Sequence, residues 1–251
     1  MVSYRPIQPH ECGALVDLHH RCFDSAEIRG TIFFSPRVVN YLQQITRFAK
    51  HQQEYFLMGA WHDQRLIGYC WGRALENSWH LNYFAVAPEE RKAGTGRNLY
   101  LHWLDSGRQR GYQKYSLDVN STNGQAQAWY ERLGWHTNSM SYCYEQPLQP
   151  ASDGLDVRLQ LRGWESAEAW QNRYGFSTFE ITDSKKHWTI GRLADDYFRA
   201  SEELPEDVQS LLCRIDATRR LFLLLPEPIT NWTPIKVACR MHLLAEKDLP
   251  S

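Results

Sequence analysis

The first 146 residues alternate between stretches with a strand-like pattern and stretches with a helix-like pattern. Short segments rich in apolar residues and bounded by turn residues predict strands, and residues 115–119 alternate between apolar and polar positions; the strands are expected at 3–7, 55–61, 66–73, 79–86, 115–119 and 142–145. Apolar side chains that recur every three or four positions predict helices, at 9–22, 36–49, 99–110 and 126–133. Ser35 and Pro36 mark one helix start, because serine caps a helix and proline suits its first turn.

A change of character near residue 150 predicts a second domain. Residues 146–154 contain prolines, a glycine and a serine, which is typical of a linker. We therefore expect a domain at 1–148, a linker at 149–154 and a smaller α+β domain at 155–251. In this last part, alternation predicts strands at 157–161 and 235–243, and the unbroken apolar run at 221–225 predicts a more buried strand. A repeat of apolar residues every three or four positions predicts an amphipathic helix at 190–198.

The composition is that of an ordinary globular protein and excludes several function classes. The chain has 251 residues, of which 43% are hydrophobic and 23% charged, and its net charge is −1. It therefore lacks the basic surplus of proteins that bind nucleic acid or a membrane surface. No apolar run approaches the about 20 residues that a membrane-spanning helix needs.

The cysteines and histidines indicate the cellular compartment and argue against a metal site. Six scattered cysteines form no CxxC pair, and the N-terminus lacks the apolar stretch of a signal peptide. Both observations favour a reducing, cytoplasmic location. His19, His20 and Cys22 have no evident fourth partner, so we expect no metal site.

The segment 86–99 joins a predicted strand to a predicted helix through a loop with two glycines. Backbone N–H groups at a helix N-terminus are unpaired and carry partial positive charge, so they bind phosphate groups. Gly94 and Gly96 let the backbone approach an anion closely. Three side chains add positive charge, namely Arg91, Lys92 and Arg97. The alternative is an ordinary strand–turn–helix connection with a solvated basic patch, since short glycine patterns recur by chance.

A second motif, at 123–135, follows the predicted strand at 115–119. Arg91, Gly94 and Gly96 fit the pattern Arg/Gln-x-x-Gly-x-Gly/Ala. Asn-x-x-Ala-x-x-x-Tyr-x-x-x-Gly-Phe is fitted by Asn123, Ala126, Tyr130 and Gly134, with Trp135 in place of the phenylalanine. In these residues the sequence resembles the GNAT superfamily of acyl-CoA-dependent N-acetyltransferases, over about residues 3–146. Two motifs in register make the resemblance specific for the family, but they say little about the acyl acceptor.

The resemblance implies a fold and a cosubstrate. The fold would be α+β, with a mixed, mostly antiparallel sheet flanked by helices, and the cosubstrate would be acetyl-CoA, with no metal. In such proteins two neighbouring parallel strands, here 79–86 and 115–119, separate and take up the pantetheine arm. The implied cofactor-binding residues are Ala85, Val86, Arg91, Lys92, Ala93, Gly94, Thr95, Gly96, Arg97, Asn123 and Tyr130.

The resemblance also implies a role for each group. Backbone groups at Ala85 and Val86 would hold the thioester region, the loop 91–97 would wrap the pyrophosphate, and Asn123 would bind the pantetheine arm. Tyr130 would be the general acid that protonates the departing thiolate. The alternative for Tyr130 is a packed helix aromatic, because its helix presents an apolar stripe on that face.

The general base is where the sequence departs from the family pattern. Many members carry a glutamate where this chain has Asn82, which cannot accept a proton. His80 lies two residues earlier and would face the same way in a regular strand, and its pKa range suits a base. A histidine on the surface at a strand end is the alternative interpretation. Tyr83 and Glu76 are weaker candidates, and deprotonation through water or by the substrate stays open.

Three functions are compatible with these residues. The first is an enzyme that transfers acetyl from acetyl-CoA to a primary amine of a small molecule or protein, by direct attack in a ternary complex. The second is a non-catalytic acyl-CoA-binding or sensor protein, which the asparagine at position 82 keeps open. The third is a structural or partner-binding module in which both motifs are vestigial.

Residues 155–251 carry neither motif. They are compatible with a degenerate second half of the same family. We expect them to pack against the first domain and wall off the acceptor site, or to form a homodimer. We expect no nucleic-acid and no membrane partner.

Overall fold

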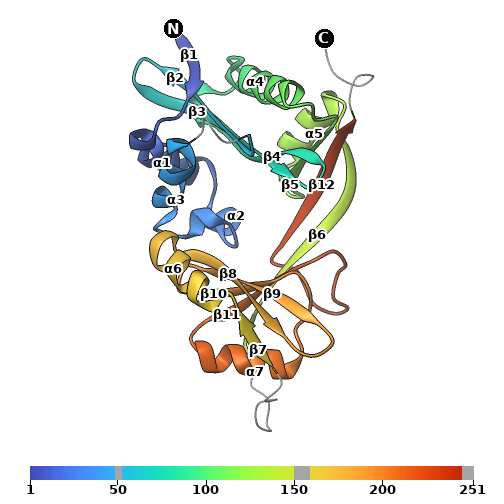
Figure 1. Ribbon diagram of the computed structural model, residues 1–251. Helices are drawn as coiled ribbons and strands as arrows, with labels where there is room; N and C mark the ends of the chain where they lie inside the picture. Colours follow the sequence, from blue (N-terminus) through green and yellow to red (C-terminus); the bar gives the residue numbers. More distant parts are fainter. Residues whose placement is uncertain (49–52, 150–158, 245–251) are drawn as a thin grey trace. The chain divides into compact units, whose positions relative to one another are not determined.

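The computed structural model describes residues 1–48, 53–149 and 159–244 (Figure 1). Contacts divide the chain into two compact units. Unit 1 comprises Met1–Glu27, Tyr41–Ser139 and Ala238–Ser251, and unit 2 comprises Ile28–Asn40 and Met140–Val237. This division differs from the boundary expected at 149–154. The N-terminal unit takes its last strand from the end of the chain, and the C-terminal unit takes residues 28–40 from near its beginning. Of the expected linker, only Gln149 lies among the described residues.

Unit 1 is built on a mixed sheet with the strand order β1-β2-β3-β4-β5-β12. The strands are β1 (Val2–Pro6), β2 (Tyr55–His62), β3 (Arg65–Leu75), β4 (Ser78–Val86), β5 (Lys114–Asn120) and β12 (Lys236–Leu244). Only β4 and β5 pair in parallel, and the other neighbours are antiparallel. The strand predictions for this half are thereby confirmed, with bounds that differ by a few residues.

Helices cover both faces of this sheet. Unit 1 contains η1 (Pro9–Glu11), α1 (Cys12–Cys22), η3 (Pro88–Glu90), α4 (Thr95–Gln109) and α5 (Gly124–Arg132), with most of α2 (Ser25–Ile28) and α3 (Val38–Arg47), whereas η2 (Ile32–Phe34) lies within unit 2. The helix α4 packs on β2, β3 and β4, whereas α1 packs on β3 and β4 from the other side (Figure 1). α3 begins at Val38 rather than at Pro36, and Ser35 accepts a hydrogen bond from the Arg37 N–H just before it.

Large aromatic side chains fill the core between α4 and the sheet. Trp79, Trp103 and Trp135 are all buried, and Trp103 stacks on Trp135. The Trp79 indole N–H donates to the backbone carbonyl of Trp103, which fixes α4 on β4. Gly72 makes room for this packing, because a Cβ there would lie 2.4 Å from the Trp103 indole nitrogen. The aromatic layer holds α4 against the sheet.

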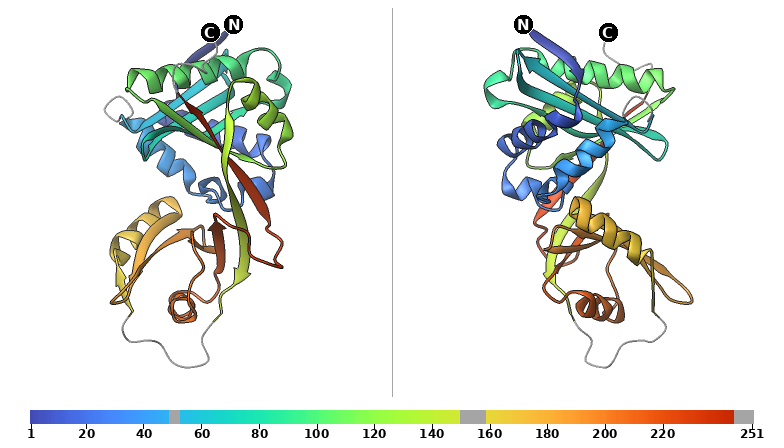
Figure 2. Two further views of the ribbon diagram at one scale, coloured as in Figure 1. Left: turned by 90° about the vertical axis from the view of Figure 1, so that its right-hand side faces the viewer. Right: turned by 60° about the vertical axis from the view of Figure 1, so that its left-hand side comes forward.

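The strands of unit 2 are arranged in the order β7-β8-β9-β10-β11-β6. Its strands are β6 (His136–Pro147), β7 (Gln160–Arg162), β8 (Phe176–Thr182), β9 (His187–Leu193), β10 (Tyr197–Ala200) and β11 (Arg220–Leu225). Only β10 and β11 pair in parallel. Helices α6 (Trp164–Tyr174) and α7 (Glu206–Ile215) pack around these strands (Figure 2).

The two units share one design, with the final strands exchanged. In each unit four antiparallel strands lead to one parallel pair, and an antiparallel strand closes the order. By sequence, β6 follows α5 of unit 1, yet it pairs with β11 of unit 2. Conversely β12 follows β11 but pairs with β5 of unit 1. The second half therefore repeats the strand arrangement of the first.

The helix predicted at 190–198 is wrong. This segment forms β9 and β10 joined by a tight turn, in which Ala194 has a φ of 47°. Arg219 is buried beneath the turn and donates to the carbonyls of Ala194 and Tyr197, at 2.9 and 3.2 Å. A short strand, a turn and a second short strand placed apolar residues at helical spacing by coincidence.

Candidate functional site

The parallel strands β4 and β5 separate after a short paired stretch. They pair at Trp79–Tyr115, His80–Ser116 and Leu81–Leu117. β4 continues to Val86 and β5 to Asn120 without further pairing between them. Backbone N–H and C=O groups on the facing edges are thus open to a hydrogen-bonding partner. An extended ligand with amide groups can bind such an opening like an added strand.

A β-bulge at Asn82 sets the direction of the side chains along β4. Trp71 pairs with Tyr83 and Gly72 with Leu81, so Asn82 is the extra residue. A bulge reverses the alternation of faces beyond it. Accordingly Trp79 before the bulge bonds to α4, and Phe84 beyond it stacks on Trp129 of α5. His80 and Tyr83 therefore share the face opposite α4, and the regular strand that would align His80 with Asn82 is absent.

The loop after β4 leads into a helix N-terminus that has no capping side chain. Gly94 occupies the cap position of α4 with a φ of 85°, makes no side-chain cap, and the first turn contains no acidic residue. Lys92 also has a positive φ, of 67°. The free N–H groups and the helix dipole favour an anion at this point.

Gly96 is not required by the packing of the protein itself. A Cβ at this position would lie 3.6 Å from Phe84 and Val86, an ordinary van der Waals distance, and its φ is not in the left-handed region. Glycine in the first turn of a helix costs stability relative to alanine. The glycine is therefore best explained by a ligand that approaches the backbone.

The charges around the loop are positive on balance. The side chains of Arg91, Lys92 and Arg97 are exposed. The two glutamates before them, Glu89 and Glu90, both pair with Arg65, and Glu89 also pairs with Arg21, so two arginines compensate the two carboxylates. The Arg91 Nε donates to the Val86 carbonyl at 3.2 Å, which ties the loop to the end of β4. A pyrophosphate at the α4 N-terminus would therefore meet three cations.

The two backbone positions expected for the thioester region differ in placement. The Ala87 N–H donates to Ile67 of β3, so alternation turns the backbone groups of Ala85 toward β3 as well. Val86 turns its groups to the other edge, where its carbonyl accepts from Cys22 Sγ and Arg91. Of the two, Val86 faces the separated edge.

Asn123 caps the helix that follows β5. Its side-chain oxygen accepts a hydrogen bond from the Ala126 N–H at 3.1 Å, which fixes the first turn of α5. With the oxygen occupied, the amide NH₂ is the group that can donate to a ligand beside β5. The asparagine thus caps the helix and leaves its amide NH₂ able to donate to a ligand.

Tyr130 lies in the core on the face that carries α4 and α5. Its ring contacts Trp129 and Trp135, and the residue is 7% exposed. Burial raises the pKa of the phenol far above its ordinary range, and the neighbouring Cys70 and Tyr100 add to the rise. Tyr130 is therefore protonated at neutral pH, although the raised pKa makes the hydroxyl a weaker proton donor than a free phenol.

His80 is buried where β4 and β5 are still paired. Its Nδ1 lies 3.0 Å from Ser116 Oγ, and its Nε2 lies 3.9 Å from an Asp118 carboxylate oxygen. Burial lowers the pKa of His80 to about 4, although Asp118 acts in the opposite direction. The imidazole is consequently neutral at pH 7. The surface histidine considered from the sequence is wrong, because His80 is only 3% exposed.

The other candidate bases lie elsewhere in unit 1. Glu76 sits in the turn between β3 and β4 with a φ of 52° and lines a cavity of about 210 Å³ with Ser78, Lys114 and His242. Tyr83 meets the ring of His19 edge-on, with the ring centres 5.5 Å apart. Neither residue shares the hydrogen bonds of His80.

Sequence reasoning missed three residues next to His80. Ser116 and Asp118 are the polar positions of the alternating strand β5, so their pattern marked them as lying on one face. No pattern in the sequence marked Arg240, because this residue lies on β12 and contacts Asp118 across 122 positions of the sequence. Its guanidinium holds the Asp118 carboxylate through two hydrogen bonds.

The described part of the chain contains no helix long and apolar enough to cross a bilayer. Within the same residues, no three histidine, cysteine or acidic side chains gather closely enough to hold a metal ion.

Residues 14–135 match the model of the acetyltransferase (GNAT) family. The [ribosomal protein bS18]-alanine N-acetyltransferase of Salmonella typhimurium is 26% identical over 116 residues, which are 46% of this chain and 78% of that protein. The family match stops short of the second half. The sequence resemblance is thereby confirmed.

Two solved structures show the same fold. A tandem GNAT protein from the clavulanic acid biosynthesis pathway matches with a TM-score of 0.68 at 11% identity, over 100% of both chains. The PaiA N-acetyltransferase from Thermoplasma acidophilum, solved with coenzyme A, matches with a TM-score of 0.50 at 16% identity, over 55% of this chain and 92% of that one. The protein therefore carries a GNAT acetyltransferase domain at residues 14–135. Its fold matches that of the tandem GNAT protein over the whole of both chains.

Proposed function

We propose that the protein is an N-acetyltransferase that moves an acetyl group from acetyl-CoA to a primary amine. The observation that carries this proposal is the separation of β4 from β5, with an uncapped, basic helix N-terminus at the end of β4. An opening for an extended amide chain and a site for phosphate thus adjoin each other. Coenzyme A combines these two chemical features in one molecule.

Each group of the candidate site is assigned to one part of acetyl-CoA. Loop 91–97 and the first N–H groups of α4 hold the pyrophosphate, and Val86 and Asn123 contact the pantetheine arm. The thioester then lies near the point where β4 and β5 part, between Tyr130 on one face and His80 on the other.

The reaction is a direct transfer in a ternary complex. The nitrogen of the neutral amine forms a bond to the thioester carbonyl carbon, and the carbon–sulfur bond breaks. The amine loses a proton to His80 Nε2, and the thiolate takes a proton from the Tyr130 hydroxyl. The products are the N-acetyl amine and coenzyme A, and solvent returns one proton from His80 to Tyr130. A neutral imidazole suits this step, because it must accept a proton only once the nitrogen has begun to bond.

The acceptor is a primary amine of a small molecule or of a protein. The Salmonella relative acts on the alanine of ribosomal protein bS18, which supports testing peptides with an N-terminal alanine. The net charge of −1 gives no preference for a polycationic acceptor. A test panel therefore includes alanine peptides, lysine peptides and small amines.

Release of the coenzyme A thiol over this panel tests the proposal. Tyr130→Phe keeps the ring but removes the proton donor, so kcat should fall about 100-fold while the Kd for acetyl-CoA stays within about twofold. Tyr144→Phe is the matched control, since it removes a buried hydroxyl in unit 2 that accepts from Ile229. Unchanged turnover in Tyr130→Phe would contradict the role of general acid.

A non-catalytic acyl-CoA sensor is the second candidate. It is favoured by Asn82 at the usual position of the base and by the lowered pKa of His80, about 4, which makes the imidazole a weak proton acceptor. This function predicts tight binding of acetyl-CoA and no thiol release with any amine of the panel. Turnover with one amine excludes it.

A further inference from the structure

A directed chain of hydrogen bonds ends on His80 within unit 1. The Ser78 hydroxyl donates to the backbone carbonyl of Leu75 at 3.0 Å. Ser78 Oγ lies 2.7 Å from Ser116 Oγ, and Ser116 Oγ lies 3.0 Å from His80 Nδ1. The three side chains are wholly or partly buried.

The carbonyl at the far end determines the direction of every bond in this chain. A carbonyl oxygen only accepts, so the single hydroxyl hydrogen of Ser78 is committed to Leu75. Ser116 must then donate to Ser78, which commits the hydroxyl hydrogen of Ser116 as well. In its contact with His80, Ser116 can only accept, so Nδ1 of the neutral imidazole carries the hydrogen.

The other ring nitrogen then holds the lone pair. Nδ1 faces Ser116 and the paired end of the strands, whereas Nε2 faces Asp118, the first residue of β5 beyond the paired stretch. The Asp118 carboxylate lies 3.9 Å from Nε2 and is itself held by Arg240. When Nε2 takes up a proton, this carboxylate stabilises the new charge.

We propose that Ser116 and Ser78 are positioning residues that hold His80 as the Nδ1–H tautomer, with Nε2 free to accept the proton of the acceptor amine. Asp118 and Arg240 form the charged partner of the protonated ring. The arrangement replaces the missing carboxylate at Asn82, and it depends on β12, because that strand supplies Arg240. The catalytic part of this inference rests on the proposed function, and the hydrogen-bond chain does not.

The tautomer can be measured directly on the intact protein. With histidine labelled by ¹⁵N, two-bond correlations distinguish a protonated Nδ1 from a protonated Nε2, and His80→Gln identifies the signals of this ring among the 10 histidines. At pH 7 we expect the Nδ1–H tautomer in the wild type. In Ser116→Ala the ring should move toward Nε2–H, and Ser116→Thr should restore Nδ1–H. An Nε2–H ring in the wild type would overturn the inference.

A second buried serine provides the control. Ser106 donates to the Trp103 carbonyl in the α4 core and is not part of this chain of hydrogen bonds. Ser106→Ala should leave the His80 tautomer unchanged. If Ser106→Ala and Ser116→Ala shift the tautomer equally, general loosening of unit 1 explains the effect and the proposal is wrong.

Turnover separates failure of the network from failure of the proposed function. In Ser116→Ala we expect kcat to fall about tenfold with little change in KM, and Ser116→Thr should recover it, as for a base held in the wrong tautomer. An Nδ1–H ring combined with full turnover of His80→Gln would keep the hydrogen bonds but refute the catalytic role of His80. If the wild type does not bind acetyl-CoA, the proposed function is refuted instead.

Discussion

His80 makes the stability of the protein depend on pH. The charged and titratable groups that act on its ring are Asp118, Arg240, Arg73 and His242. The pKa of His80 is about 4 in the folded protein and about 6.5 in an unfolded chain. The unfolded state therefore binds more protons between these values, so stability is full above pH 6.5 and is lost as the pH falls toward 4. From pH 7 to pH 5 the loss from this group is about 2 kcal/mol.

Urea unfolding of the wild type and of His80→Gln at both pH values measures this contribution. The variant lacks the titrating ring, so it should lose about 2 kcal/mol less than the wild type between pH 7 and pH 5. Equal losses in the two proteins would show that His80 does not carry the pH dependence.

The sequence predicted which residues belong to the candidate site better than it predicted which way their side chains point. The loop residues 91–97 and Asn123 lie at helix N-termini, as their patterns predicted. The bulge at Asn82 was not predictable, because nothing in the local alternation marks an extra residue. It changes which side chains share a face with His80, and only the register against β3 reveals it.

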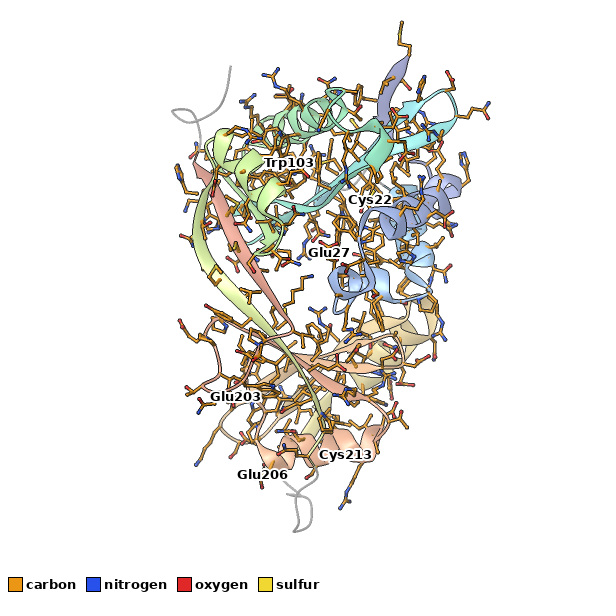
Figure 3. The ribbon with its side chains drawn as sticks, turned by 180° about the vertical axis from the view of Figure 1, so that it is seen from behind. Cys22, Glu27, Trp103, Glu203, Glu206 and Cys213 are labelled. Atoms are coloured by element: carbon orange, nitrogen blue, oxygen red, sulfur yellow. The ribbon has the colours of Figure 1, made fainter. Side chains whose placement is uncertain are left out.

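At the element scale, the helix N-termini of the two units carry opposite charge. α7 occupies in unit 2 the place that α4 has in unit 1, between the parallel strands. Its first turn holds Glu206 and Asp207, and Glu203 precedes it (Figure 3). β10 and β11 also stay paired over the whole of β10. At α7 and at β10 and β11, the described residues of unit 2 therefore form neither an anion site nor an opening, in agreement with the missing motifs.

Arg97 tests the charge of the α4 N-terminus. A cation in the first turn opposes the helix dipole, so Arg97→Gln should raise the stability by about 0.5 kcal/mol. If Arg97 contacts a phosphate, the same change should also lower the affinity for acetyl-CoA about tenfold, and the loss should be smaller at high salt. Calorimetric titration and urea unfolding measure the two effects.

Arg108 at the other end of α4 is the matched control. It lies in the last turn and pairs with Asp105 at 3.0 Å, so Arg108→Gln should lower stability slightly and leave binding unchanged. Equal affinity of Arg97→Gln and the wild type would remove Arg97 from the cofactor site.

The elements of the second half were harder to predict than those of the first. An unbroken apolar run predicted β11 and alternation predicted β12, but α6 and α7 were not predicted, and 190–198 was assigned to a helix. In that segment the buried guanidinium of Arg219 holds the turn between two short strands. Such a contact joins residues distant in sequence, so periodicity cannot show it.

At the scale of the whole molecule, the repeated strand order and the exchanged strands explain the division of the chain. The strand order of each unit is closed by a strand from the other half of the sequence, β12 for unit 1 and β6 for unit 2. The boundary expected from composition at 149–154 cannot reveal this exchange. The pairing of β12 with β5 and of β6 with β11 joins segments far apart in the sequence, so local composition carries no sign of it. The sequence did predict the family and the fold class, since both motifs lie within 86–135.

The same comparison of the two units predicts one acetyl-CoA per chain. Among residues 1–48, 53–149 and 159–244, the combination of separated parallel strands with a basic, uncapped helix N-terminus occurs in unit 1 and not at the corresponding place of unit 2. One matched pair of variants isolates this site. Gly96 and Gly13 are each the second residue of a helix, α4 and α1, and neither has a positive φ. A glutamate suits the first turn of either helix, so both variants should fold.

Calorimetric titration of the wild type, Gly96→Glu and Gly13→Glu with acetyl-CoA is the most direct test of the account. We predict a stoichiometry of one per chain for the wild type and Gly13→Glu. Gly96→Glu should lose at least about 100-fold in affinity, because its carboxylate would occupy the phosphate position. Full binding by Gly96→Glu, or no binding by the wild type, would contradict the claim that the α4 N-terminus and the parted strands hold an acyl-CoA.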